Sequence, residues 1–160
     1  MKVFLVAGAW PNFMKIAPIY RASLAYGDVD CQIIHTGQHY DYEMSQAFFE
    51  DLEIPKPQYF LDAGSGPHAV QTAKIMVAFE EVCIKEKPDL IMVVGDVNST
   101  LACSIVAKKL LINVAHVEAG LRSFREKWDR YLFSPENQND NPLFYSSLPR
   151  FPLGCFNLAD

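Results

Sequence analysis

The sequence predicts an α/β domain with a doubly wound parallel sheet, and three observations support this prediction. Short apolar runs alternate with longer segments whose apolar residues recur at helical spacing. Two of these runs, residues 91–95 and 112–117, flank a helical segment, residues 99–111, which makes a strand–helix–strand unit. A carboxylate follows each run directly, Asp96 after the first and Glu118 after the second. Because open α/β sheets bind ligands outside the carboxyl ends of their strands, both acids are expected at the ligand edge.

The other elements follow the same alternation. Residues 3–7 form a continuous apolar run, as in a strand covered on both faces, and Pro11 is well placed to open the next helix. The pattern then predicts a helix at 13–25, a strand at 31–36, a helix at 42–52, a short strand at 58–61, a loop at 63–67 and a helix at 69–85.

This regular pattern ends near residue 124. Residues 125–160 hold four of the ten prolines and seven aromatic residues, with no sustained period of either kind. We therefore expect one Rossmann-like domain over residues 1–124, and a divergent, poorly ordered tail over residues 125–160.

Composition excludes several classes of function. The chain has 160 residues, half of them apolar, which is enough core for one domain. A net charge of -5 and a pI near 5.3 argue against nucleic acid as a main partner. The apolar runs are too short to span a membrane, and the N-terminal run lacks the features of a secretory signal. Four scattered cysteines with no C-x-x-C pair indicate a cytoplasmic protein with reduced thiols.

The turn after the first strand is the first candidate site. A small-residue turn that leads into a helix at Pro11 directs free N–H groups at an incoming anion, and Lys15 can add positive charge to a phosphate. An ordinary turn with a solvated lysine explains the same residues, because such turns are common to all doubly wound folds. The four histidines show no metal-ligand spacing, so we expect neither a metal nor a cofactor.

The segment 95–100 allows two interpretations. Asp96 can act as a general acid or base, but Asp, Asn, Ser and Thr are also the residues that cap helices. We expect the cap at Asn98 or Ser99, which leaves Asp96 available for chemistry.

Glu118 closes an apolar strand, where a carboxylate is costly to bury unless it is paired or functional. An ion pair with Arg122 is the structural alternative. His116 lies two residues earlier, on the same face by strand alternation, and we expect it to be a hydrogen-bonded core histidine. The loop that begins at Gln38 follows the second strand, where it can contact a sugar or nucleotide or be a plain polar loop.

Taken together, four segments carry a family resemblance. Residues 8–15, 35–40, 95–100 and 116–123 resemble the non-hydrolysing UDP-N-acetylglucosamine 2-epimerases in order and spacing. The similarity covers about residues 1–124 and reaches Pro135 and Glu136. That family has the two-domain architecture of GT-B glycosyltransferases, and this chain resembles its N-terminal half.

The resemblance implies inversion at C2 of UDP-GlcNAc to give UDP-ManNAc, by elimination and re-addition of UDP. A weakly acidic C2 proton needs a positioned carboxylate base, and departure of UDP needs positive charge or N–H donors. The implied catalytic residues are Asp96, Glu118 and Glu136; the implied substrate-binding residues are Lys15, Pro11, Arg122 and Ser123; and Gln38 and His39 match a loop that holds a regulatory UDP-GlcNAc. Members of the family are cytoplasmic homodimers that serve cell-envelope polysaccharide synthesis.

Two departures from the family pattern stand out. The family reads Gly-x-Arg-Pro in its first motif, but Trp10 replaces the arginine and offers one N–H in place of a charged fork. A third carboxylate at Glu136 is followed by Asn137, where family character ends, as after a frameshift or truncation. We therefore expect the chain to be inactive alone. A non-catalytic nucleotide-sugar-binding fragment and half of a GT-B glycosyltransferase are the alternatives.

Overall fold

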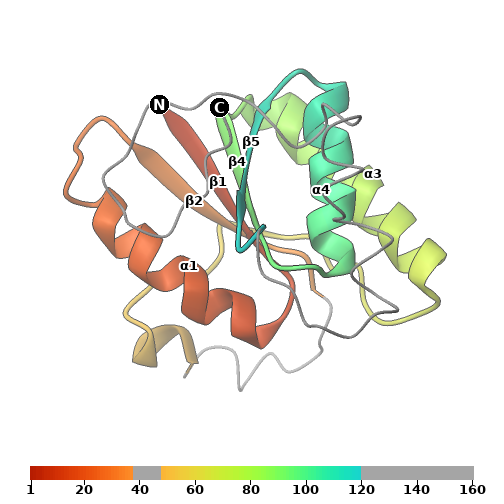
Figure 1. The fold of residues 1–160 in the computed structure, drawn as a ribbon, viewed down its shortest axis with the longest axis horizontal. Coiled ribbons are helices and arrows are strands. Elements are labelled where there is room, and N and C mark those ends of the chain that lie inside the picture. The colour runs from red at the N-terminus through yellow and green to blue at the C-terminus, as the bar shows by residue number, and fades with distance from the viewer. Residues whose placement is uncertain (38–47, 120–160) are drawn as a thin grey trace.

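The computed structural model describes residues 1–37 and 48–119 and confirms the predicted α/β class. Within these residues five parallel strands form one sheet in the order β3-β2-β1-β4-β5. The strands are β1 (Lys2–Ala7), β2 (Asp30–His35), β3 (Tyr59–Phe60), β4 (Leu90–Val94) and β5 (Asn113–Val117), and the helices are α1 (Trp10–Ser23), α3 (His68–Glu86) and α4 (Asn98–Lys109) (Figure 1).

The strand order reverses direction in the middle of the sheet. The chain runs outward from β1 through β2 to β3, then returns to place β4 and β5 on the other side of β1. The loops that leave the carboxyl ends of β1 and β4 therefore diverge, and such a switch point is where doubly wound sheets bind their ligands.

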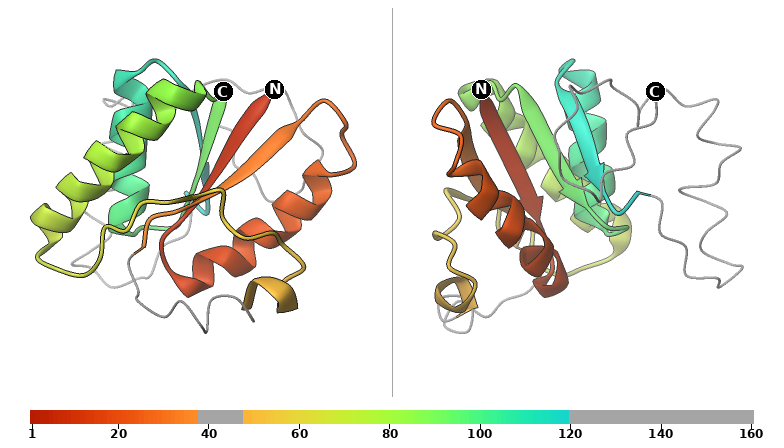
Figure 2. Two further views of the ribbon diagram at one scale, coloured as in Figure 1. Left: turned by 180° about the vertical axis from the view of Figure 1, so that it is seen from behind. Right: turned by 60° about the vertical axis from the view of Figure 1, so that its left-hand side comes forward.

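Helices cover both faces of the sheet. Figure 2 shows α1 on one face and α3 with α4 on the other. Strand alternation explains the two layers: Phe4 and Val6 of β1 pack with the α3 and α4 side, whereas Val3, Leu5 and Ala7 pack with the α1 side. Because all five of these side chains are buried, β1 is a central strand covered on both faces, as its continuous apolar run predicts.

The predicted elements agree with the structure in type and differ at their ends. Helix α1 begins at Trp10 instead of residue 13, because Pro11 already adopts the fixed backbone of a first helical turn. Strand β3 keeps only two residues, as befits an edge strand. Residues 48–51 of the predicted helix 42–52 are helical. The rest of that helix and the predicted tail lie outside the described residues.

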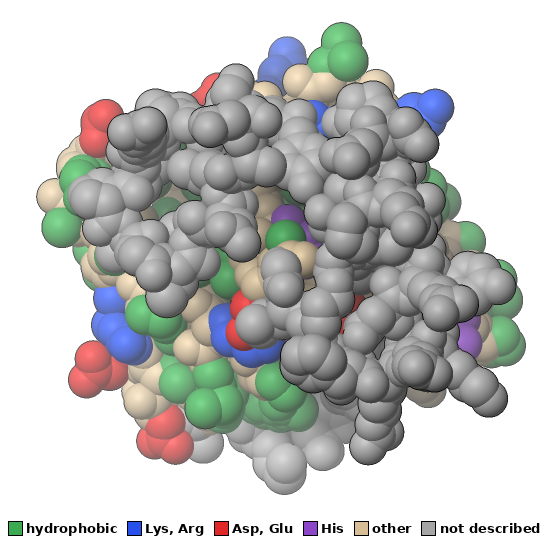
Figure 3. Space-filling view, viewed as in Figure 1, with side chains coloured by type: hydrophobic (Ala, Val, Ile, Leu, Met, Phe, Trp, Pro, Cys, Tyr) green, Lys and Arg blue, Asp and Glu red, His purple; other side chains and the backbone are tan. Residues whose placement is uncertain are grey.

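The described surface agrees with the composition. Lys and Arg side chains stand apart from one another on the face shown in Figure 3. Among the described residues, no helix is both long and apolar enough to span a membrane.

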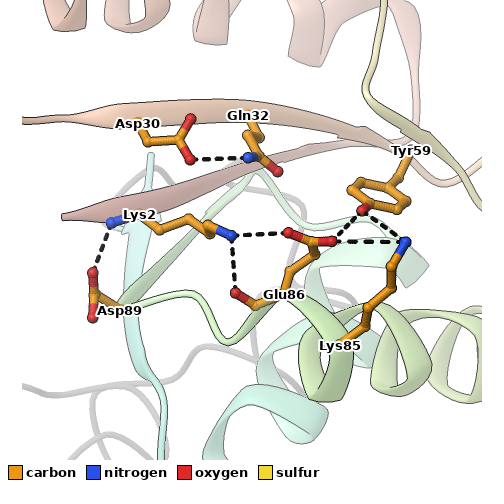
Figure 4. A network of polar contacts seen from close by, with 7 residues as sticks. All are labelled: Lys2, Asp30, Gln32, Tyr59, Lys85, Glu86 and Asp89. Carbon is orange, nitrogen blue, oxygen red and sulfur yellow. Dashed lines mark hydrogen bonds and ion pairs between the residues drawn. The ribbon is translucent and has the colours of Figure 1, made fainter.

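A polar network fastens the edge of the sheet opposite the expected ligand edge (Figure 4). Glu86, the last residue of α3, accepts a hydrogen bond from Lys2 Nζ (2.8 Å) and another from Tyr59 Oη (2.5 Å). These bonds join the central strand β1, the edge strand β3 and the end of α3. Asp89 continues the network by accepting a 2.6 Å bond from the backbone N–H of Lys2.

This network predicts a pH dependence of stability. The bonds from Lys2 and Tyr59 hold the pKa of the Glu86 carboxyl at about 2, against 4.5 for a free glutamate. A lowered carboxyl pKa stabilises the fold fully above about pH 4.5, and this contribution disappears as the pH falls toward 2. In urea unfolding, Glu86→Gln should be less stable than the parent at pH 7, with a difference that shrinks below pH 4.5. The exposed Glu81 gives the control, because Glu81→Gln should follow the parent at every pH.

Gly37, at the carboxyl end of β2, sits in a close backbone contact. Its φ is +75°, and a Cβ atom there would lie 2.9 Å from the Cα of Asp62. Both the left-handed conformation and the contact with backbone exclude larger residues. Gly37 itself is held to the segment after β3, with Gly64 N–H donating to the Gly37 carbonyl (3.0 Å).

We expect Gly37→Ala to lower the free energy of unfolding by about 2 kcal/mol or more, because the new methyl group meets backbone that cannot rotate away. Gly27→Ala is the matched control, since a Cβ at Gly27 meets no atom within 4 Å. Equal urea midpoints for the two variants would contradict the close approach.

Candidate active site

The carboxyl ends of β1, β4 and β5 bring three of the predicted site residues to one edge of the sheet. Lys15 lies on the second turn of α1, Asp96 follows β4, and Glu118 follows β5. Lys15 Nζ forms an ion pair with Glu118 Oε2, although 103 residues separate them in the chain. Their side chains are 35% and 28% exposed, so the pair is reachable from solvent.

This ion pair gives Glu118 a partner that the sequence analysis does not name. An apolar strand that ends in a glutamate requires a partner for it, and Arg122 is the nearest candidate in sequence. In the structure the partner is Lys15 on α1. Arg122 lies outside the described residues.

The backbone at Glu118 is strained. Its φ is +69°, in the left-handed region that favours glycine, and it follows directly on the end of β5 at Val117. Such a conformation costs a non-glycine residue about 1–3 kcal/mol and is concentrated at functional sites. The side chain that this turn presents forms the ion pair with Lys15.

Asp96 is exposed, and the helix that follows does not use it as a cap. The expectation that Asn98 or Ser99 caps α4 is wrong: the N-cap is Val97, and no side chain caps the helix. Asn98 instead donates from Nδ2 to Gln71 Oε1 (2.7 Å), which ties the start of α4 to α3. Ser99 is buried, 1% exposed.

The end of β4 is held by side chains from two helices. The Val94 carbonyl accepts hydrogen bonds from Thr100 Oγ1 (2.7 Å) on α4 and from Asn12 Nδ2 (3.4 Å) on α1. Both donors are almost completely buried. Asn12 and Thr100 lie inside two of the family motifs, which marks them in the sequence as candidates for a functional role. Their residue types do not indicate that both bind the Val94 carbonyl.

His116 on β5 also contacts this turn, as a hydrogen-bonded histidine, and this confirms the sequence expectation. Its Nε2 lies 2.7 Å from the Gly95 carbonyl oxygen. Burial lowers the pKa of His116, while the bond to Gly95 and the charges of Asp96 and Glu118 oppose this shift. The imidazole is therefore neutral near pH 7.

Within the described residues, three helices begin at this edge of the sheet without a side-chain cap. None of α1, α3 and α4 has a side-chain cap, and none has an acidic residue in its first turn. Unpaired N–H groups and the positive end of the helix dipole favour an anion at such positions. Pro11 is exposed in the first turn of α1. The arrangement suits a negatively charged ligand at the switch point.

Trp10 occupies the N-terminus of α1 and is half-buried. Its ring packs edge-to-face on Phe48, with centroids 4.5 Å apart. Phe48 in turn contacts Phe13, so the indole belongs to an aromatic cluster on the α1 face. A neutral ring thus stands where the resemblance implies a charged guanidinium.

The remaining predicted site residues are not all in the described part of the chain. Gln38, His39, Arg122, Ser123 and Glu136 lie outside it, so their predicted roles stay predictions. Within residues 1–37 and 48–119, no group of three or more potential metal ligands is found.

Comparison with known proteins gives a consistent result. The sequence profile of a family described as UDP-N-acetylglucosamine 2-epimerase matches residues 22–139. A protein of Methanococcus maripaludis named UDP-N-acetylglucosamine 2-epimerase homolog is 50% identical over 172 aligned residues, which cover 100% of this chain and 47% of that protein. A UDP-2,3-diacetamido-2,3-dideoxy-D-glucuronate 2-epimerase of Pseudomonas aeruginosa is 46% identical, over 78% of this chain and 35% of its own length.

Solved structures agree with the sequence matches. The UDP-GlcNAc 2-epimerase of Methanocaldococcus jannaschii, in complex with UDP-GlcNAc and UDP, superimposes with a TM-score of 0.73 at 49% identity. That match covers 79% of this chain and 34% of the other. The chain thus spans about half or less of the length of the relatives that it matches.

Asn98 has a tertiary hydrogen-bond partner, whereas Asp96 is exposed and does not cap α4. The free energy of unfolding of alanine variants tests this difference. Asn98→Ala should lower the free energy of unfolding by about 1 kcal/mol, because the bond to Gln71 is lost. Asp96→Ala should change it by less than about 0.5 kcal/mol. If Asp96 capped α4, its removal would instead cost about 1 kcal/mol. Urea unfolding of the two variants beside the parent distinguishes these outcomes.

Proposed function

The chain belongs to the UDP-N-acetylglucosamine 2-epimerase family, and we propose that the protein inverts C2 of UDP-GlcNAc to give UDP-ManNAc. The observation that carries the proposal is the meeting of Lys15, Asp96 and Glu118 at one edge of the sheet, beside open helix N-termini. This combination offers carboxylates for proton transfer and positive charge for a leaving diphosphate.

We assign proton transfer at C2 to the two carboxylates. Asp96 is exposed at the end of a strand whose backbone is held from both sides, so it can approach a sugar ring without reorganising the fold. Removal of the C2 proton with departure of UDP gives a 2-acetamidoglucal. Return of UDP and of a proton on the other face of C2 completes the inversion. Glu136 is our candidate for a third carboxylate.

Lys15 has a double role in this proposal. Its ammonium group carries three N–H donors, so it can hold Glu118 with one and a phosphate oxygen with another. Pro11, Arg122 and Ser123 are proposed to complete the substrate contacts, and Gln38 with His39 to contact a regulatory nucleotide sugar.

Free thiols at Cys31, Cys83 and Cys103 fit a reducing cytoplasm, and we infer assembly as a homodimer from the resemblance.

A second sugar substrate has specific support. The Pseudomonas aeruginosa relative, named for a diacetamido glucuronate, is 46% identical to this chain. Its reaction is the same inversion at C2 on a sugar with different substituents at C3 and C5. Both UDP-sugars therefore belong in any assay.

The 160-residue chain should show no turnover of UDP-GlcNAc above a no-protein control, because Asp96 is exposed to water within the described residues.

Residues 1–119 fused to the remaining part of the Methanococcus maripaludis relative should epimerise UDP-GlcNAc and exchange its C2 proton for deuterium in D2O, as followed by proton NMR. Trp10→Arg in this fusion should raise the rate by about tenfold, because a guanidinium binds diphosphate better than an indole.

Two further variants of the fusion serve as controls. Trp10→Phe keeps an aromatic ring and adds no charge, so it should remain slow. Asp96→Asn should reduce the rate by about 10²-fold or more, because the base is lost. A fusion that folds and binds UDP-GlcNAc but neither epimerises it nor exchanges its C2 proton, even with Trp10→Arg, would contradict the proposed function.

A further inference from the structure

The turn that carries Asp96 is held by a side chain that the proposed chemistry does not use. His116 Nε2 lies 2.7 Å from the carbonyl oxygen of Gly95. That carbonyl belongs to the peptide unit joining Gly95 to Asp96. A hydrogen bond to it therefore fixes the plane of the peptide from which Asp96 projects, and with it the direction of the carboxylate.

The other side of Gly95 is held by the same strand. The Gly95 N–H donates to the Val117 carbonyl (3.1 Å), one residue beyond the last ladder pair, Val94 with Val117. Gly95 has φ +68°, so the chain turns sharply here and leaves the sheet. The backbone on both sides of this turn is thus attached to β5, the strand that leads into Glu118.

The chemistry of the contact defines which nitrogen of the His116 ring carries hydrogen. A carbonyl oxygen only accepts, so the hydrogen must be on Nε2 of His116. Burial keeps the imidazole neutral against the pull of Asp96 and Glu118, the two carboxylates that face it. Lys15 is paired with Glu118, and a neutral His116 carries no charge. Neither Lys15 nor His116 therefore neutralises the negative charge of Asp96. A positively charged imidazolium at this place would stabilise the Asp96 carboxylate and so make it a weaker base.

We propose that His116 is a positioning residue: by donating a hydrogen bond from Nε2 to the Gly95 carbonyl, it sets the direction of Asp96 relative to Glu118. This inference rests on the proposed function for its catalytic meaning. The geometry that it claims can be measured on the 160-residue chain without any ligand.

The test uses nitrogen-15 NMR of the 160-residue chain and three variants. In the parent, the imidazole nitrogens should report a neutral ring with hydrogen on Nε2 at pH 7. His116→Phe removes the donor and should speed amide exchange at Gly95 about tenfold. His116→Gln retains an N–H donor of similar reach and should stay within about twofold of the parent. Asn113→Ala, at the opposite end of β5, is exposed and should leave Gly95 unchanged.

Each outcome bears on the proposal. Hydrogen on Nδ1 alone would overturn it even if His116→Phe does not fold. Unchanged Gly95 exchange in a folded His116→Phe variant, or equal loss of protection in the Phe and Gln variants, would also overturn it. Adding UDP-GlcNAc to the parent separates the two proposals. Failure of the ligand to shift the Asp96 signals would count against the proposed function, while the exchange results still decide the role of His116.

Discussion

The burial of β1 and β4 on both faces is the constraint on which the rest of the structure depends. Each of these strands packs against α1 on one side and against α3 and α4 on the other, so a shift of either strand would break close packing on both faces at once. Fixed register aligns the strand ends, and parallel order gathers their carboxyl ends at one edge. Residues that are far apart in the chain meet there as a consequence of core packing.

This origin explains which features the sequence predicts. The strands are readable because a strand buried on both faces must be apolar throughout, as residues 3–7 and 91–95 are. Asp96 and Glu118 are readable for a related reason, since a charged residue directly after such a run can lie only at the edge of the sheet. The fold class and the approximate place of the site therefore follow from local patterns alone.

Other features depend on which side chains meet across the sheet, and local patterns do not encode this. The pairing of Lys15 with Glu118 spans 103 residues, so it appears only in the packed fold. The capping prediction failed for a similar reason. Asn98 has the right residue type for a cap, but a tertiary partner on α3, Gln71, takes its side-chain amide. Thr100 and Asn12 likewise bind a strand carbonyl that their own neighbours in sequence do not reveal.

The contact between Trp10 and Phe48 gives position 10 a part in the packing of the domain. Phe48 lies in the helical segment 48–51 and packs with the apolar residues that cover the α1 face of the sheet, where its ring contacts Trp10. An arginine at position 10 would give up this edge-to-face contact, worth about 1 kcal/mol. Trp10 thus contributes packing at a position where the proposed function would favour positive charge, so replacing it should alter stability as well as any effect on the reaction.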